Sequence, residues 1–82
     1  MELKLYMFET CPYCMKVLNA IENSGRTDVE LHNIHKSEND RRTLIEVGGK
    51  QQVPCLFIDG KPMYESDDIV DWLEAHPQRR RG

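Results

Sequence analysis

Two cysteines separated by two residues, Cys11 and Cys14, constrain this chain more than any other feature. They directly follow an apolar, strand-like run from Leu3 to Phe8 and directly precede a segment with helical periodicity. A thiol at a helix start lies near unpaired backbone N–H groups and the positive end of the helix dipole, which favour the thiolate. The thiolate is the form that attacks disulfides, and a thiol one turn later can close a bridge. The motif therefore predicts a thiol–disulfide exchange site.

The helical pattern gives the two thiols different surroundings. Cys14 begins an i, i+3, i+4, i+7 stripe on the core face, whereas Cys11 is expected at the exposed tip. We therefore predict that Cys11 attacks and that Cys14 resolves from beneath. The alternatives are a metal-ligand or inert role for Cys11 and a purely structural role for Cys14. The third thiol, Cys55, is expected to be buried and apolar, with oxidation-based regulation or metal binding as the alternative.

The size of the chain indicates one small domain, which we expect over residues 1–77, followed by a disordered basic tail over 78–82. The net charge is −3, so composition does not suggest nucleic-acid binding. No apolar stretch reaches membrane-spanning length and no secretory leader is recognised, so we expect a cytoplasmic protein without membrane association. Three cysteines are too few for a secreted disulfide framework.

Hydrophobic periodicity and turn residues predict the element order β-α-β-α-β-β-α. Strands are expected at 3–8, 29–34, 55–58 and 61–64, with the first strand central and parallel to the second. Pro62 implies that the fourth strand lies at an edge. Ser37 and Ser66 are predicted helix N-caps. The predicted fold class is α/β, with a four-stranded mixed sheet and helices on both faces.

These residues together resemble the glutaredoxins, within the thioredoxin superfamily, and the resemblance implies a thioredoxin-like fold. It consists of Cys-Pro-Tyr-Cys after the first strand, the Val53-Pro54 step before the third and the acidic pair Asp67-Asp68 at the start of the last helix. It runs from about Leu3 to Leu73. The resemblance implies that Pro54 is in cis and faces the active cysteines.

The chain departs from the glutaredoxin pattern at two places. Phe8 stands where the family usually has a lysine, and with Glu9 nearby we expect less thiolate at Cys11 than in glutaredoxins that have the lysine. The family tends to have glycines before its acidic pair. Here Glu65-Ser66 precedes it, which looks like the glutathione-binding step of the N-terminal domain of glutathione transferases.

The resemblance also implies a set of glutathione contacts. The backbone of Val53 would pair with the cysteinyl part, and the start of the last helix would hold the γ-glutamyl end. A basic or amide side chain in the loop before Val53 would meet the glycine carboxylate. For Ser66 and Asp67 the alternative is ordinary helix capping. For Tyr13 it is a surface aromatic without a binding role, and for the loop residues before Val53 it is a solvated charge. The candidate residues are Tyr13, Lys50, Gln51, Val53, Pro54, Glu65, Ser66 and Asp67.

The function that follows is a glutathione-dependent dithiol oxidoreductase that reduces protein disulfides or glutathione mixed disulfides. Glutathione would be a co-substrate, with no permanently bound cofactor and no metal. The expected partners are glutathione and disulfide-containing or glutathionylated proteins, with the chain a monomer. Two alternatives stay open: a glutathione-independent redoxin served by thioredoxin reductase, and a [2Fe–2S] cluster-binding module.

Overall fold

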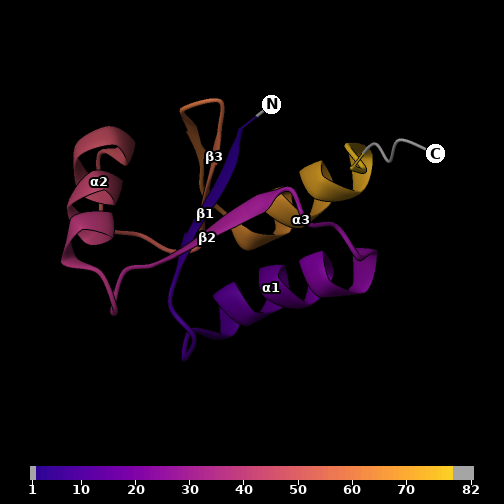
Figure 1. Cartoon of the computed structure of the whole chain (residues 1–82), viewed down its shortest axis with the longest axis horizontal. Coiled ribbons are helices and arrows are strands. Elements are labelled where there is room, and N and C mark those ends of the chain that lie inside the picture. Colours follow the sequence, from indigo (N-terminus) through magenta and orange to yellow (C-terminus); the bar gives the residue numbers. More distant parts are fainter. Residues whose placement is uncertain (1, 79–82) are drawn as a thin grey trace.

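The computed structural model describes residues 2–78, and its elements follow the predicted order (Figure 1). Four of the five residues of the predicted basic tail, 79–82, lie outside the described residues. The first, second and fourth strands each end one residue earlier than predicted. The strands are β1 (Leu3–Met7), β2 (Val29–Asn33), β3 (Cys55–Ile58) and β4 (Lys61–Met63), and the helices are α1 (Pro12–Ser24), α2 (Glu38–Gly48) and α3 (Ser66–Ala75).

The four strands form one mixed sheet in the order β2-β1-β3-β4. β1 is central, as predicted, and pairs in parallel with β2 and antiparallel with β3. β4 lies at the other edge and carries Pro62, whose missing N–H an edge strand tolerates. Because β1 and β2 are parallel, the segments that follow Met7 and Asn33 leave the sheet at the same end.

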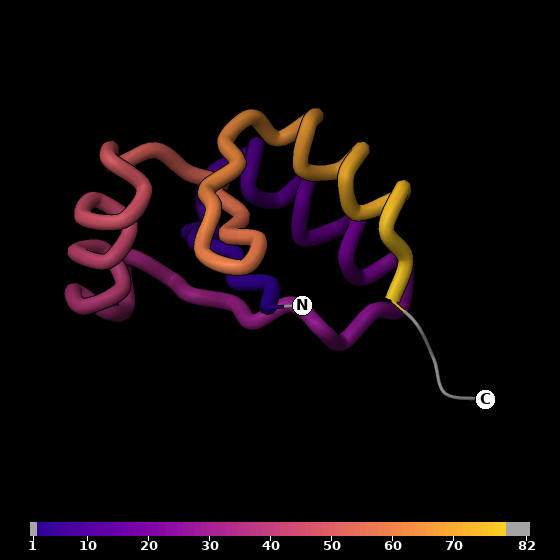
Figure 2. The backbone as a smooth tube through the Cα atoms, turned by 90° about the horizontal axis from the view of Figure 1, so that it is seen from above, coloured from indigo at the N-terminus to yellow at the C-terminus, as the bar shows by residue number. Residues whose placement is uncertain are grey.

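The helices cover both faces of the sheet, which confirms the predicted fold class. α1 and α3 lie side by side on one face and α2 lies alone on the other (Figure 2). β1 serves both layers because alternate side chains point to opposite faces. Leu3, Leu5 and Met7 join the cluster under α1 and α3. Tyr6 joins the cluster under α2.

Several apolar side chains of the outer elements remain exposed. Leu31 is 51% exposed, and it lies on β2, an edge strand of the sheet. Ile45 and Val47 of α2 are also exposed, and Leu44 is the buried residue of this helix. Periodicity identifies the apolar face of a helix, but the amount of cover depends on what packs against it.

The helix ends agree with prediction except at α3. Ser37 caps α2, and its side chain accepts a hydrogen bond from the Asp40 backbone N–H at 3.2 Å. Ser66 was predicted to cap α3, but it is already the first helical residue. The N-cap is Glu65, with φ 66° and no side-chain capping bond. Positive φ is uncommon for a residue with a side chain, so the sequence favours Ser66 as the cap.

Arg26 is a charged side chain that is buried near the far end of α3. Its guanidinium forms a bidentate pair with the Asp28 carboxylate at 2.7 and 2.9 Å, and its Nη1 donates to the Leu73 carbonyl oxygen at 3.0 Å. The pairing with Arg26 lowers the pKa of Asp28. This network ties the segment after α1 to the last turn of α3.

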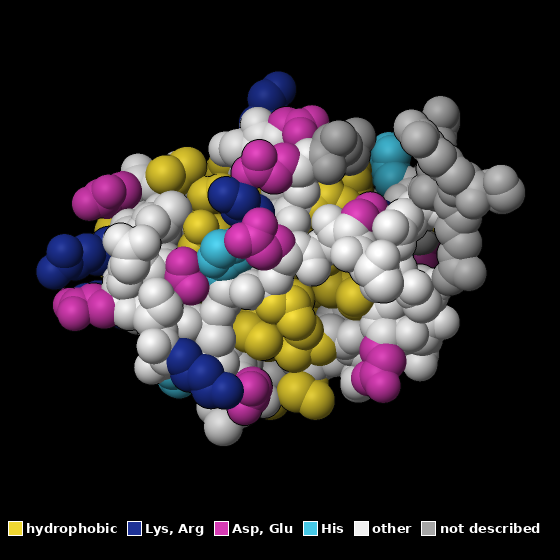
Figure 3. Space-filling view, in the orientation of Figure 1, with side chains coloured by type: hydrophobic (Ala, Val, Ile, Leu, Met, Phe, Trp, Pro, Cys, Tyr) yellow, Lys and Arg dark blue, Asp and Glu magenta, His cyan; other side chains and the backbone are white. Residues whose placement is uncertain are grey.

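The surface in the view of Figure 3 carries acidic and basic side chains interspersed, without a large area of one sign. This fits the small net charge of the chain. None of the helices in the described part of the chain has the length and apolar character that a membrane span requires.

Candidate active site

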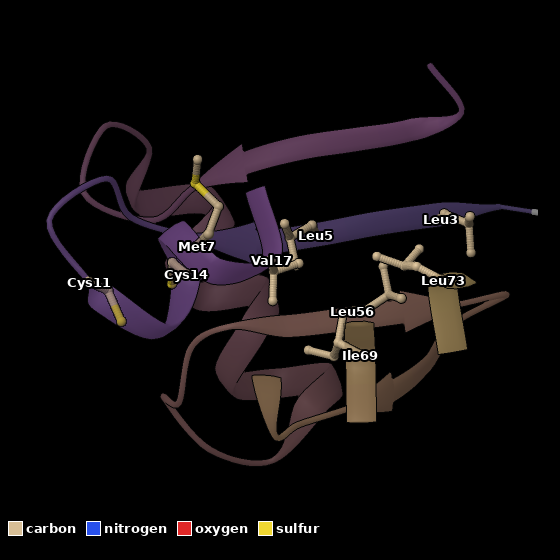
Figure 4. Close-up of a cluster of buried hydrophobic side chains, with 9 residues drawn as sticks. All are labelled: Leu3, Leu5, Met7, Cys11, Cys14, Val17, Leu56, Ile69 and Leu73. Atoms are coloured by element: carbon tan, nitrogen blue, oxygen red, sulfur yellow. The ribbon is translucent and has the colours of Figure 1, made fainter. Parts of the chain in front are cut away.

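The two cysteines of the motif lie at the start of α1 (Figure 4). Cys11 is the N-cap residue, and Pro12 takes the first helical position, where a missing N–H costs nothing. The Cys11 carbonyl accepts a hydrogen bond from the Met15 backbone N–H at 3.0 Å. Cys14, one turn later, lies close to Cys11.

Cys11 is more enclosed than the sequence indicates. Cys14 is fully buried, as expected, but Cys11 is only 9% exposed and does not stand at an open tip. The reason is that Cys11 packs into the same apolar cluster as Cys14, Val17 and Ile69. A small part of Cys11 therefore remains accessible at the surface, while Cys14 has no exposed surface.

The surroundings of Cys14 keep its thiol protonated. Both thiols of the motif are free, and their side chains are hydrogen-bonded to each other. Burial raises the pKa of the Cys14 thiol to about 12, a hydrogen bond with the Phe8 backbone opposes the rise, and the neighbouring Cys11 adds to it. Cys14 is therefore a neutral thiol at physiological pH.

The loop that carries Cys11 is contacted by the turn that follows β2. The Phe8 ring stacks on the His35 ring with centroids 4.2 Å apart and planes 11° from parallel. The Glu9 carboxylate lies 3.4 Å from Lys36 Nζ. His35 and Lys36 were not among the predicted site residues. The signal that could have found them is the parallel pairing of β1 and β2, which places the two following segments side by side.

The Val53-Pro54 step lies in the loop between α2 and β3. Its peptide bond is cis, which confirms the prediction. Pro54 is buried, and Val53 packs against both apolar clusters, one of which contains Cys11 and Cys14. Lys50 and Gln51 are exposed in the same loop.

Tyr64 braces this loop from the other side and was missing from the predicted site. Its hydroxyl donates to the Gly48 carbonyl oxygen at 2.9 Å, with the Lys50 carbonyl oxygen at 3.3 Å. Lys50 Nζ lies 4.5 Å from the centre of the Tyr64 ring, a cation–π contact. The hydroxyl also hydrogen-bonds Cys55. Burial raises the pKa of Cys55 to about 11, against the effect of this bond.

The start of α3 presents the remaining candidates. Ser66 is half-buried, whereas Glu65 and Asp67 are exposed. The Asp67 carboxylate forms an ion pair with Lys16 on α1, and this bond raises the pKa of Lys16. Lys16 was also missed, because nothing local in the sequence relates it to a residue 51 positions away.

Tyr13 lies on the outer side of α1 and is 66% exposed, as predicted. Within residues 2–78, no group of three His, Cys, Asp or Glu side chains is arranged to hold a metal ion.

Comparisons with known proteins agree with this geometry. Residues 5–81 match the family model described as glutathione S-transferase, N-terminal domain. Glutaredoxin-C4 of Arabidopsis thaliana is 34% identical over 67 residues, which are 79% of this chain and 50% of that protein. Glutaredoxin 3 of Escherichia coli (strain K12) is 31% identical over 67 residues, 82% of this chain and 80% of that protein.

Among solved structures, glutathione transferase Omega 3C from Trametes versicolor superimposes with a TM-score of 0.75 at 26% identity, over 92% of this chain and 33% of that one. The chain thus spans half the length of the plant glutaredoxin and a third of the transferase. The bacterial glutaredoxin is matched over most of its length. The chain belongs to the glutaredoxins, a family of thiol–disulfide oxidoreductases within the thioredoxin superfamily.

Proposed function

We propose that this chain is a glutathione-dependent thiol–disulfide oxidoreductase in which Cys11 is the nucleophile and Cys14 the resolving thiol. The observation that carries the proposal is the pair of neighbouring thiols at the start of α1, of which Cys11 is partly accessible and Cys14 fully buried. Cys11 is the N-cap of α1 and is partly accessible, where the helix dipole favours a thiolate. Cys14 is buried and neutral, so it can donate a hydrogen bond to that thiolate.

The reaction begins when the Cys11 thiolate attacks the glutathione sulfur of a protein–glutathione disulfide. A bond forms between Cys11 and glutathione, the original S–S bond breaks, and the protein sulfur leaves as a thiolate that takes a proton from solvent. A second glutathione thiolate then attacks the glutathione sulfur bound to Cys11. Oxidised glutathione leaves, and Cys11 returns to its thiolate form.

A protein disulfide is reduced through Cys14. After Cys11 forms a mixed disulfide with the substrate, Cys14 loses its proton and attacks the Cys11 sulfur, which gives an internal disulfide and a reduced substrate. Two glutathione molecules then reduce the internal disulfide. Burial is the main cause of the raised Cys14 pKa, and capture of Cys11 in a mixed disulfide would remove the smaller contribution of the neighbouring thiol.

Glutathione would bind along the face formed by Tyr13, the Val53-Pro54 step and the start of α3. The backbone of Val53 would pair with its cysteinyl part, and Lys50 or Gln51 would meet the glycine carboxylate. The first turn of α3 favours the carboxylate of the γ-glutamyl end, and Glu65 or Asp67 would hold its amine. The match to the transferase N-terminal domain supports this arrangement.

The decisive experiment is an assay coupled to glutathione reductase, with a glutathionylated peptide and a protein disulfide as substrates. Cys11→Ser should abolish both activities. Cys14→Ser should retain removal of glutathione but lose reduction of the protein disulfide. Cys55→Val, outside the site, should retain both. Full activity of Cys11→Ser would refute the proposal.

A second candidate is a redoxin that takes its electrons from thioredoxin reductase. Two observations favour it: Phe8 replaces the usual lysine, and Asp67 is already paired with Lys16. Replacing glutathione and glutathione reductase by thioredoxin reductase in the same assay separates the two candidates.

We also propose that the chain acts as a monomer in the cytoplasm. Helices cover both faces of its sheet, and three cysteines are too few for a secreted disulfide framework. The molar mass in solution tests the oligomeric state, and fractionation of the cell tests the compartment.

A further inference from the structure

We infer that His35 is a positioning residue for the active-site loop and that it acts through Phe8. The inference rests on the proposed function, because it assigns a role in the reactivity of Cys11. It concerns a residue on the turn between β2 and α2, which lies outside both the Cys-Pro-Tyr-Cys motif and the expected glutathione contacts.

Phe8 is the point through which a displacement would reach both thiols. Its carbonyl oxygen accepts a hydrogen bond from the Cys11 backbone N–H at 3.4 Å. Its backbone also hydrogen-bonds the Cys14 side chain. A movement of Phe8 therefore changes the surroundings of the nucleophile and of the resolving thiol together.

The Phe8 ring is half-buried, and His35 stacks against it from the turn after β2, nearly parallel at 4.2 Å. Stacked rings exclude water from their shared face and restrict each other's rotation. The stack therefore holds the Phe8 side chain, and with it the backbone that contacts the two cysteines.

The turn that carries His35 is itself firmly held. The Ile34 backbone N–H donates to the Met7 carbonyl oxygen at 3.0 Å, and Ile34 is buried. The Asn33 side-chain oxygen accepts from the backbone N–H of His35 at 2.9 Å and of Lys36 at 3.3 Å. His35 thus starts from a fixed backbone, which is what a positioning side chain requires.

The second contact between the two segments, from Lys36 to Glu9, is weaker. Its side chains are 72% and 63% exposed, so solvent screens the pair. Lys36 partly offsets the negative charge that Glu9 brings near Cys11. In the stack between His35 and Phe8, by contrast, Phe8 is half-buried and its carbonyl oxygen accepts a hydrogen bond from the Cys11 backbone. The stack is therefore the contact that positions the loop.

The test compares His35→Ala with His35→Phe, which keeps an aromatic ring in place. The measurement is the second-order rate of alkylation of Cys11 by iodoacetamide at pH 7, followed by mass spectrometry of the Cys11 peptide. We expect His35→Ala to slow alkylation at least fivefold and His35→Phe to stay within twofold of the wild type. A matched control is His76→Ala, which removes a stack of similar geometry with Trp72, at 4.2 Å and 15°, at the end of α3.

Phe8→Leu supplies an independent check. It should slow alkylation about as much as His35→Ala, and the double variant should be no slower than either single variant, because the two rings act as one unit. An unchanged rate in His35→Ala overturns the inference, as does a His35→Phe rate as low as that of His35→Ala. Alkylation needs no glutathione, so this result stays distinct from failure of the proposed function.

Discussion

Lys16 on α1 forms an ion pair with Asp67, the second residue of α3. The helix that carries the two thiols is thereby linked to the helix start at which we propose that glutathione binds. Both side chains are largely exposed, so the pair adds little to stability. Its importance lies in competition, since the amine of glutathione would use the same carboxylate.

Lys16→Ala should therefore lower the KM for glutathione, because it frees the Asp67 carboxylate. Solvent screens this exposed pair, so the decrease should be modest, at most about fivefold. Asp67→Asn should raise the KM. Arg42→Ala, which removes another exposed pair on α2, is the control. A higher KM in Lys16→Ala would show that Lys16 itself assists binding.

The three cysteines should differ sharply in native-state alkylation. Burial raises the pKa of Cys14 to about 12 and that of Cys55 to about 11, so both are protonated at pH 8. A thiol reacts slowly when the pH is well below its pKa, and the side chains of Cys14 and Cys55 are also inaccessible. Mass spectrometry after brief treatment at pH 8 should find one modified cysteine, Cys11. Urea should expose all three, and equal labelling without urea would contradict the burial.

Tyr64→Phe should destabilise the chain by about 1 kcal/mol, because it removes one hydroxyl that bonds the loop before β3. Cys55 should then become harder to ionise, since its interaction with the Tyr64 hydroxyl lowers its pKa. Urea unfolding measures the stability. Tyr13→Phe, at an exposed position, should leave the free energy of unfolding unchanged.

Gly48→Ala tests the same brace from the opposite side. An added Cβ at Gly48 would collide with the Tyr64 hydroxyl. We expect the substitution to cost about 1–3 kcal/mol in the wild type, as overpacking does, and less in a Tyr64→Phe background. Equal costs in both backgrounds would mean that the hydroxyl is not what the added methyl group meets.

Arg26→Ala should cost about 3–5 kcal/mol, because it leaves Asp28 and the Leu73 carbonyl without their buried partner. The folded-state pKa of Asp28 lies below its unfolded value, so the pair stabilises the fold above about pH 4, and this stability is lost as the pH falls through the lowered pKa. Asp28→Asn should flatten that acid limb of the stability curve. Arg41→Ala, at a more exposed pair, should change little.

The parts of this structure that follow from local sequence were predictable. The strand before Cys11, Pro12 in the first helical turn and the Ser37 cap each depend on residues a few positions apart. The element order follows in the same way from apolar periodicity. The cis peptide before Pro54 was predicted from the resemblance to glutaredoxins, since a Val-Pro pair alone is compatible with either isomer.

The parts that depend on tertiary contact were not predicted. Contacts between elements bring Lys16 and Tyr64 to the site, and no local pattern marks them. The position of His35 could have been inferred only from the parallel pairing of the first two strands. The burial of Cys11 has the same origin, because an N-cap residue is exposed or enclosed according to what packs over it. Glu65 adopts a positive φ, which a residue with a side chain rarely does. The N-cap of α3 could therefore be located only in the folded chain.

The alternation of side chains along β1 carries a consequence for insertions and deletions. This strand sends Leu5 to one layer and Tyr6 to the other, and Cys11 follows it after a short loop. Losing one residue inside β1 would exchange the two faces beyond that point and shorten the path to the nucleophile. Length variation in this domain is therefore better tolerated at Gly60, in the β3–β4 turn, than anywhere between Leu3 and Cys14.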